Sequence, residues 1–268
     1  MTARKEPERV GPTSKPNVKR GALVTGAASG MGRAVAIRLA EEGFSVAVLD
    51  LDAVEGKRTV LAVQAAGGNG VFVRTDVSEE SSVLSAVGQS AREVGPIVAL
   101  VNAAGIAFTA TVVETAESDW DRVLDTNLKG TFLMTKHVIP HLLRSGGGAI
   151  VNIASNAGLV GVPNLSAYCA SKGGVVQLSQ ALAIELAGQN IRVNTVAPSS
   201  TLRTRMFEAR LARSREPKVL EATIAASNPM KRLCTPEDVA ELVLYLASDR
   251  ASYVTGGVFP IDGGLTAA

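Results

Sequence analysis

Residues 25–32 read Thr-Gly-Ala-Ala-Ser-Gly-Met-Gly, and this stretch decides the fold. An apolar run precedes it and an amphipathic stretch follows it, which is the pattern of a strand that turns into a helix. Glycines let the backbone approach a pyrophosphate, and the N-terminus of the helix offers N–H donors and a positive dipole end. Taken alone, the motif is equally a plain turn. In its strand–turn–helix context it predicts nucleotide contacts at Gly26, Ser29, Gly30, Met31 and Gly32.

Outward from this turn, apolar runs and helical patterns alternate to the end of the chain, which predicts βαβ units and a parallel sheet. No linker interrupts residues 19–268, so the fold class is α/β, one doubly wound domain with seven parallel strands and helices on both faces. The expected strands are 20–25, 45–50, 70–75, 97–102, 149–154, 191–196 and 258–261. The expected helices are 31–42, 53–66, 79–94, 120–144, 166–187 and 236–247, and Pro140 should end or kink the fourth.

Composition excludes several classes of protein. The chain has 268 residues, of which 46% are hydrophobic and 4% aromatic, and its net charge of +2 gives no strong pull toward nucleic acid or an anionic membrane. Two cysteines cannot form a disulfide framework. Polar residues and glycines interrupt the charge-free stretch 145–171, and no apolar signal segment opens the chain, so we expect a cytoplasmic protein without a membrane span. Residues 1–18 are polar and proline-containing and are expected to be a disordered tail.

Polar side chains follow the next strands at the same sheet edge, where ligands bind in doubly wound folds. Asp50 ends the second strand, 24 residues after Gly26. Its carboxylate can accept both ribose hydroxyls of an adenosine and would repel a 2′-phosphate, which favours NAD over NADP; the alternative is a helix cap. Arg33 is the only nearby cation in the sequence, and it is expected to face solvent or to pack on the first helix. Further cofactor contacts are expected at Leu51, Asp76, Val77, Asn102, Ala103, Ala104 and Gly105.

Catalytic chemistry is predicted around Tyr168. Lys172 lies four residues later on the same helical face, and Ser155 follows the fifth strand. An ammonium nearby should lower the phenol pKa from its usual value of about 10, and the serine can hydrogen-bond a carbonyl or alcohol oxygen. This set suits proton transfer to an oxygen while hydride moves at its carbon. Tyr-x3-Lys alone is commonly a surface pair; combined with Ser155 and the glycine turn, it is far more specific.

These motifs together resemble the short-chain dehydrogenase/reductase family over residues 19–268. The resemblance rests on Thr25-Gly26-x3-Gly30-x-Gly32, Asn102-Ala103-Ala104-Gly105, Asn127, Ser155, Tyr168-x3-Lys172, Arg192-Val193-Asn194 and Asp262-Gly263-Gly264. It implies a Rossmann fold with Tyr168 as general acid/base, Ser155 orienting the substrate oxygen and Lys172 binding the nicotinamide ribose while lowering the tyrosine pKa. It implies that Asn127 holds a helix kink and a relay water.

The resemblance also implies nicotinamide contacts at Pro198, Ser199 and Thr201, a substrate lid at about 200–228, and a homotetramer. Serine at 199 replaces the usual glycine, and glycine tolerates positive φ better. Arginines give the segment 203–218 a local positive charge, interpreted either as a solvated lid or as an attraction for an anionic substrate. His137 and His141 have no carboxylate or cysteine nearby in sequence and are interpreted as solvated or interface residues, so no metal is expected.

The leading hypothesis is an oxidoreductase that moves a hydride between NAD(H) and a small secondary alcohol or ketone. One alternative is an NADPH-dependent reductase of carrier-bound 3-oxoacyl groups, against which Asp50 argues. The other is a non-catalytic nucleotide sensor, which would be expected to lose Tyr168 or Lys172.

Overall fold

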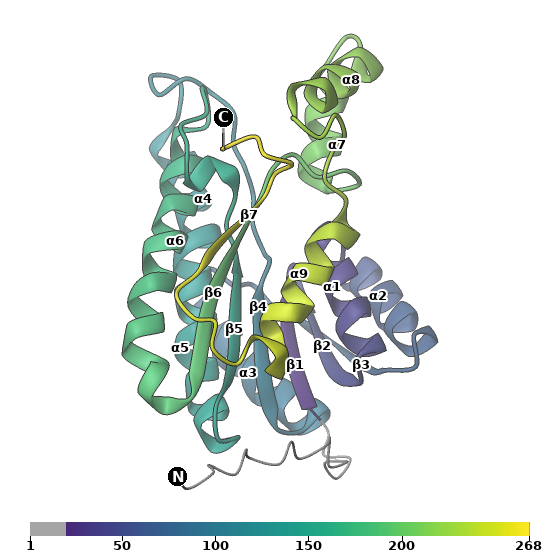
Figure 1. Cartoon of the computed structure of the whole chain (residues 1–268), viewed down its shortest axis with the longest axis vertical. Coiled ribbons are helices and arrows are strands. Elements are labelled where there is room, and N and C mark those ends of the chain that lie inside the picture. Colours follow the sequence, from purple (N-terminus) through teal and green to yellow (C-terminus); the bar gives the residue numbers. More distant parts are fainter. Residues whose placement is uncertain (1–19, 268) are drawn as a thin grey trace, which may run out of the picture.

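The computed structural model describes residues 20–267, so the expected tail lies outside the described residues. A single seven-stranded parallel sheet runs through the molecule in the order β3-β2-β1-β4-β5-β6-β7 (Figure 1). The predicted α/β fold class and strand number are confirmed. The strands are β1 (Arg20–Thr25), β2 (Phe44–Asp50), β3 (Asn69–Arg74), β4 (Ile97–Asn102), β5 (Gly148–Ile153), β6 (Ile191–Pro198) and β7 (Val258–Ile261).

Helices cover both faces of the sheet because each strand alternates its buried side chains between two cores. Ala22, Val24, Val46 and Val48 pack under one helical layer, whereas Leu23 and Leu49 pack under the other. The first layer consists of α1 (Gly30–Glu41), α2 (Ala53–Ala65) and α9 (Pro236–Ala247). The second consists of α3 (Glu80–Val94), α4 (Glu117–Leu124), α5 (Gly130–Arg144) and α6 (Ser166–Leu186). Within residues 20–267, no helix combines the length and apolarity needed to cross a membrane.

The chain reverses its direction of growth across the sheet at β1. This strand pairs with β2 on one side and with β4 on the other. The chain passes from β1 through α1 to β2 and on to β3, and α3 then carries it back past β1 to β4. Such a switch point opens a crevice beyond the carboxyl ends of the strands, where doubly wound folds bind ligands. The glycine-rich turn follows β1 directly and therefore lies in this crevice.

The expected helix 120–144 is a continuous run of three parts. A π-helical turn, Asp125–Lys129, joins α4 to α5 and inserts an extra residue into the helical ladder. Pro140 lies inside α5, which continues to Arg144, so proline does not end this helix. The side chains on both sides of Pro140 pack against the core, and tertiary packing outweighs the loss of one hydrogen bond.

The segment 201–228, expected to be a lid, folds into two short helices. These are α7 (Arg205–Ala212) and α8 (Pro217–Ser227), which stand above α9 and away from the rest of the sheet (Figure 1). Phe207 and Leu211 pack with Leu233 and, more loosely, with Leu220 and Ile224. The two helices therefore share a small core of their own, and we call residues 201–228 the α7–α8 segment.

Candidate active site

The glycine-rich turn is shaped by positions that admit no side chain. Gly26 has φ +62°, and a Cβ there would lie 2.8 Å from the Ala104 backbone. A Cβ on Gly32 would lie 2.3 Å from the Gly26 carbonyl oxygen, so the start of α1 sits directly on the turn. Thr25 Oγ1 accepts hydrogen bonds from Ala103 N and Ala104 N at 3.0 and 3.1 Å. The turn and the loop after β4 are thereby held together.

Asp50 ends β2 beside this turn. Its Oδ2 accepts a hydrogen bond from Ala28 N at 2.9 Å, and its Oδ1 accepts one from Asp52 N at 3.0 Å. The side chain is thus fixed in the crevice rather than capping α2. That cap is Asp52, whose Oδ1 accepts from Val54 N and Glu55 N. The alternative interpretation of Asp50 as a plain helix cap is therefore wrong.

The remaining expected cofactor contacts lie at the ends of β3 and β4. Asp76 Oδ1 accepts from the backbone and hydroxyl of Ser78, and Val77 is buried against Gly130 of α5. Asn102 donates through its amide to Asn152 Oδ1 at 2.8 Å and to Thr135. The Asn102 side chain is therefore engaged within the sheet layer, and its backbone and that of residues 103–105 face the crevice edge.

Asn127 occupies the π-helical turn and links two parts of the site. Its amide exchanges hydrogen bonds with the Ile106 backbone at 2.8 and 2.9 Å and donates to Ser171 Oγ at 3.0 Å. A Cβ placed on Gly105 would lie 3.3 Å from Asn127 Oδ1 and 3.4 Å from Lys172 Nζ. The helix distortion expected from the resemblance is present, and it brings Asn127, Gly105 and Lys172 to one place.

Ser155, Tyr168 and Lys172 converge at the carboxyl ends of β5 and β6. All three are buried, and a hydrogen bond joins Ser155 to the Tyr168 phenol. Ser155 Oγ also accepts from Ala157 N at 3.2 Å. Lys172 Nζ donates to the Ile153 carbonyl oxygen at 2.7 Å and lies 5.9 Å from the centroid of the tyrosine ring. The arrangement can hold a substrate oxygen between a hydroxyl and a phenol.

Burial governs the acid–base properties of this cluster. It raises the pKa of the Tyr168 phenol above its ordinary value; the Ser155 hydrogen bond opposes this rise and the Cys169 thiol adds to it. Burial also lowers the pKa of Lys172 to about 8. Burial is thus the largest influence on the pKa of the phenol in the chain as described, and a lowering of that pKa by Lys172 stays a prediction.

The loop after β6 carries the expected nicotinamide contacts. Ser199 does not adopt positive φ, so serine in place of glycine introduces no backbone strain. Its Oγ is buried and has no hydrogen-bond partner among residues 20–267. Thr201 is buried, donates to the Ser199 carbonyl oxygen at 2.9 Å and pairs with Cys234. The left-handed residue in this loop is Arg203, with φ +55°.

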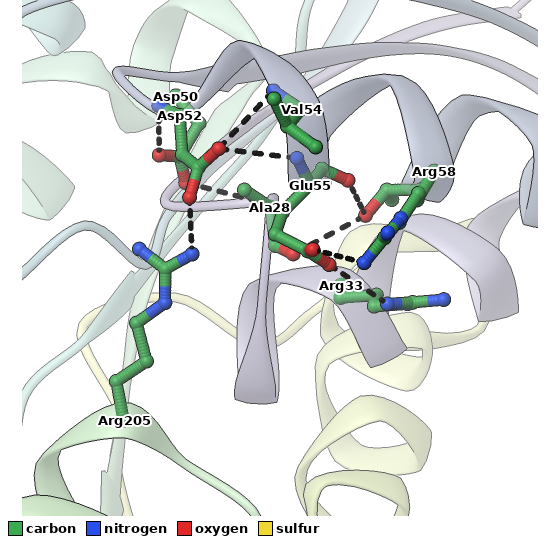
Figure 2. Close-up of polar contacts among 9 residues, drawn as sticks. Ala28, Arg33, Asp50, Asp52, Val54, Glu55, Arg58 and Arg205 are labelled. Carbon is green, nitrogen blue, oxygen red and sulfur yellow. Dashed lines mark hydrogen bonds and ion pairs between the residues drawn. The ribbon is translucent and has the colours of Figure 1, made fainter.

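The sequence analysis missed three residues at the site. Ser171 accepts from Asn127 and donates to the Tyr168 carbonyl oxygen, and its i, i+3 spacing from Tyr168 could have revealed it. Thr204 caps α7, and its side chain lies 3.2 Å from the Cβ position of Gly30 in the glycine turn. Arg205 forms an ion pair with Asp52 at 2.5 Å (Figure 2). No local signal marks that pair, because 153 residues separate its partners.

Two charged contacts differ from the sequence-based expectations. Arg33 was the only nearby cation that the sequence offered and was expected to face solvent or pack on the first helix; it lies 3.8 Å from Glu55, whereas Arg205, which was not expected here, reaches the β2–α2 turn (Figure 2). The histidine pair was expected to lack a carboxylate, yet His137 Nε2 lies 3.0 Å from Glu80 Oε1. Both partners come from distant parts of the sequence. Among residues 20–267, no three potential metal ligands gather.

The fold and the site together define a dinucleotide-dependent oxidoreductase, and comparison with known proteins agrees. A family model described as Enoyl-(Acyl carrier protein) reductase matches residues 26–266. Cis-4-hydroxycyclohexanecarboxylate dehydrogenase of Sinomonas cyclohexanicum is 43% identical over 93% of this chain and 97% of its own. The 3-oxoacyl-[acyl-carrier-protein] reductase FabG of Thermotoga maritima is 40% identical over 91% and 96%. The crystal structure of levodione reductase superposes with a TM-score of 0.90 at 34% identity, covering 94% and 99%.

The chain therefore belongs to the short-chain dehydrogenase/reductase family, whose members are oxidoreductases that use a nicotinamide cofactor.

Proposed function

We propose that this protein transfers a hydride between NAD(H) and a secondary alcohol or ketone, with Tyr168 as general acid/base. The observation that carries the proposal is the convergence of Tyr168, Ser155 and Lys172 beside a glycine turn that fits a pyrophosphate. A bound nicotinamide dinucleotide supplies or accepts the hydride. The protein provides the proton and the position of the substrate oxygen.

Each residue has a role that follows from its surroundings. The Tyr168 phenol is protonated at neutral pH, because burial raises its pKa, and in that form it donates a proton to a ketone oxygen. Ser155 hydrogen-bonds the same oxygen. Lys172 binds the nicotinamide ribose, and Asn127 together with the Ile106 backbone and Ser171 keeps the π-helical turn in place beside Lys172.

The cofactor half of the proposal rests on Asp50. Its two oxygens are oriented by backbone N–H groups, and each retains lone pairs for a ribose hydroxyl. The expected contacts at the ends of β3 and β4 complete the adenosine side, and those at 198–201 the nicotinamide side. The relatives named above supply the first substrates to assay, cis-4-hydroxycyclohexanecarboxylate and levodione.

Replacement of Tyr168 by phenylalanine tests the proposal. Tyr168→Phe keeps the ring and removes the transferable proton, so turnover should fall by roughly 10²–10⁴. The reaction is followed at the nicotinamide absorbance band, and NADH binding, measured by fluorescence, should persist. Tyr253→Phe is the matched control, since that ring is fully exposed. Near-normal turnover in Tyr168→Phe would show that Tyr168 is not the general acid/base.

The reductase of carrier-bound 3-oxoacyl groups remains a second candidate, favoured by the similarity to FabG. It requires efficient use of NADPH with a 3-oxoacyl thioester. A nucleotide sensor would bind NADH yet turn over none of these substrates. The same assays, run with both cofactors, separate the three functions.

A further inference from the structure

The α7–α8 segment is attached to the rest of the molecule on the cofactor side. Its first helix begins at Thr204, whose side chain caps α7 by accepting from Phe207 N at 3.2 Å. The same side chain lies against the Cβ position of Gly30 in the glycine turn. The start of α7 therefore passes directly over the turn that is proposed to hold the pyrophosphate.

The next residue, Arg205, reaches one strand further. Its guanidinium Nη2 donates to Asp52 Oδ2 at 2.5 Å, which joins α7 to the N-terminus of α2 (Figure 2). Thr204 and Arg205 thus contact the first and the second βα turn, respectively. Because α7 and α8 share one core, a contact at the start of α7 acts on both helices.

Asp52 is a firm anchor for this contact. Its other oxygen, Oδ1, accepts from Val54 N and Glu55 N at 3.1 Å, which caps α2. These N–H groups and Arg205 hold the pKa of the Asp52 carboxyl below its ordinary value, so it is charged at neutral pH. Its own backbone N–H donates to Asp50 Oδ1. Arg205 is therefore joined, through one residue, to the proposed ribose acceptor.

The ion pair is suited to a reversible contact rather than to a stable element of the core. The Arg205 and Asp52 side chains are 58% and 32% exposed, and exposed pairs contribute little to fold stability. An attraction of that size shifts an open–closed equilibrium severalfold without locking it. The competing acid, Glu55, is already occupied by Arg33 and Arg58.

We propose that Arg205 is a positioning residue of the cofactor site, which ties the α7–α8 segment to the wall of the adenosine-ribose pocket so that the dinucleotide leaves only when this pair opens. The inference rests on the proposed function in assigning that pocket to NAD(H). The α7–α8 segment would then retain the cofactor, in addition to its expected role as a lid over the substrate.

The test measures release of NADH by stopped-flow fluorescence, with excess NAD as the displacing ligand. Arg205→Ala should raise the dissociation rate constant of NADH about two- to fivefold. Asp52→Asn should do the same, because asparagine retains the α2 cap and loses the charge. The double variant should release NADH no faster than either single variant, since both remove one interaction. Added salt should accelerate release from the wild type and leave Arg205→Ala unchanged.

Arg210→Ala is the matched control. Arg210 lies on the same helix, is exposed, and forms no ion pair with any residue in the range 20–267. This variant should release NADH at the wild-type rate. Equal acceleration by Arg210→Ala, or wild-type rates in both Arg205→Ala and Asp52→Asn, would overturn the inference.

A second measurement is independent of cofactor chemistry. Hydrogen–deuterium exchange in the cofactor-free protein should be faster across α7 in Arg205→Ala than in the wild type. If wild-type protein bound no nicotinamide cofactor, the proposed function would fail, while faster exchange would still support the tie between α7 and α2. Unchanged exchange would refute that tie by itself.

Discussion

We propose that the choice between NAD and NADP depends on Asp50. A 2′-phosphate would bring like charge to a carboxylate held in place by Ala28 N and Asp52 N, and we expect NAD to be preferred over NADP by at least about tenfold in kcat/KM, or ~1.4 kcal/mol. Because Arg205 neutralises Asp52, this preference rests on Asp50 and not on both acids. Asp50→Ala should reduce the preference for NAD over NADP, because it lowers kcat/KM with NAD and removes the charge repulsion toward NADP.

Steady-state kinetics with both cofactors measure this preference. Asp50→Asn isolates the charge, since asparagine retains an acceptor oxygen, and Glu55→Ala is the control for a nearby acid that pairs with Arg33 and Arg58 instead. The preference should survive in Glu55→Ala. Equal efficiency with both cofactors in the wild type, or a preference untouched in Asp50→Ala, would show that another group reads the ribose.

Lys172 combines a functional role with a cost in stability. Burial lowers its pKa from 10.5 to about 8, so the folded state binds this proton less tightly than the unfolded state does. Where the unfolded state holds more protons, stability rises with pH, which places the effect between about pH 8 and pH 10.5. Below that window the buried ammonium carries its full desolvation cost.

Lys172→Met removes this dependence. The free energy of unfolding of the wild type, relative to the variant, should rise by about 2–3 kcal/mol between pH 7 and pH 10, as measured by urea denaturation. Turnover should be lost in the variant. Lys57→Met, on the outer surface of α2, is the control, and its free energy of unfolding should depend on pH as that of the wild type does. Parallel stability curves for wild type and Lys172→Met would contradict the lowered pKa.

At the scale of elements, the sequence predicted the strands and helices that a local pattern of residues specifies. All seven strands and the helices of both layers are found within a few residues of their expected bounds, since glycine turns and apolar periodicity are local signals. The family resemblance implied a helix kink at Asn127, but local pattern predicted neither its π-helical form at 125–129 nor the continuation of α5 through Pro140. Both depend on packing against the sheet and against Ile106, which no window of sequence contains.

For the candidate site, too, local features were predicted and contacts between distant segments were not. Tyr168, Lys172 and Asp50 were predicted as site residues from spacing and strand ends, because the fold class fixes where those ends meet. The sequence did not predict the Arg205–Asp52 pair, the placement of Thr204 against Gly30, or the burial that raises the pKa of Tyr168. Each of these features depends on groups that are far apart in the sequence and are brought together only by the tertiary fold.

At the scale of the whole molecule, the outer face of α4–α6 is incompletely covered. A hollow of about 440 Å³ lies there, lined mainly by Leu124, Leu128, Phe132 and Leu178. Ile184 of α6 is 84% exposed. We expect this face to pair with a second copy, with a further two-fold contact formed by β7 and the segment after it, which gives a homotetramer with two isologous interfaces.

Light scattering at micromolar concentration should give about four times the subunit mass of 27.7 kDa. Phe132→Glu should reduce the assembly to a dimer, since a buried unpaired charge is costly at an interface. Leu61→Glu, at an exposed apolar residue of α2, should leave the tetramer intact. A wild-type mass near that of one subunit would refute the assembly.

The interior position of β1 has a consequence for the order in which the proposed site is made during translation. Among the described strands, β1 is synthesised first, and it gains its second neighbour only when β4 has emerged. By then the glycine turn, Asp50 and the ends of β3 and β4 have been synthesised, whereas Tyr168 and Lys172 have not. The residues proposed to bind the adenosine half of the cofactor are thus made as one contiguous segment before those proposed for proton transfer, and α7, which contacts the glycine turn through Thr204, is made after both.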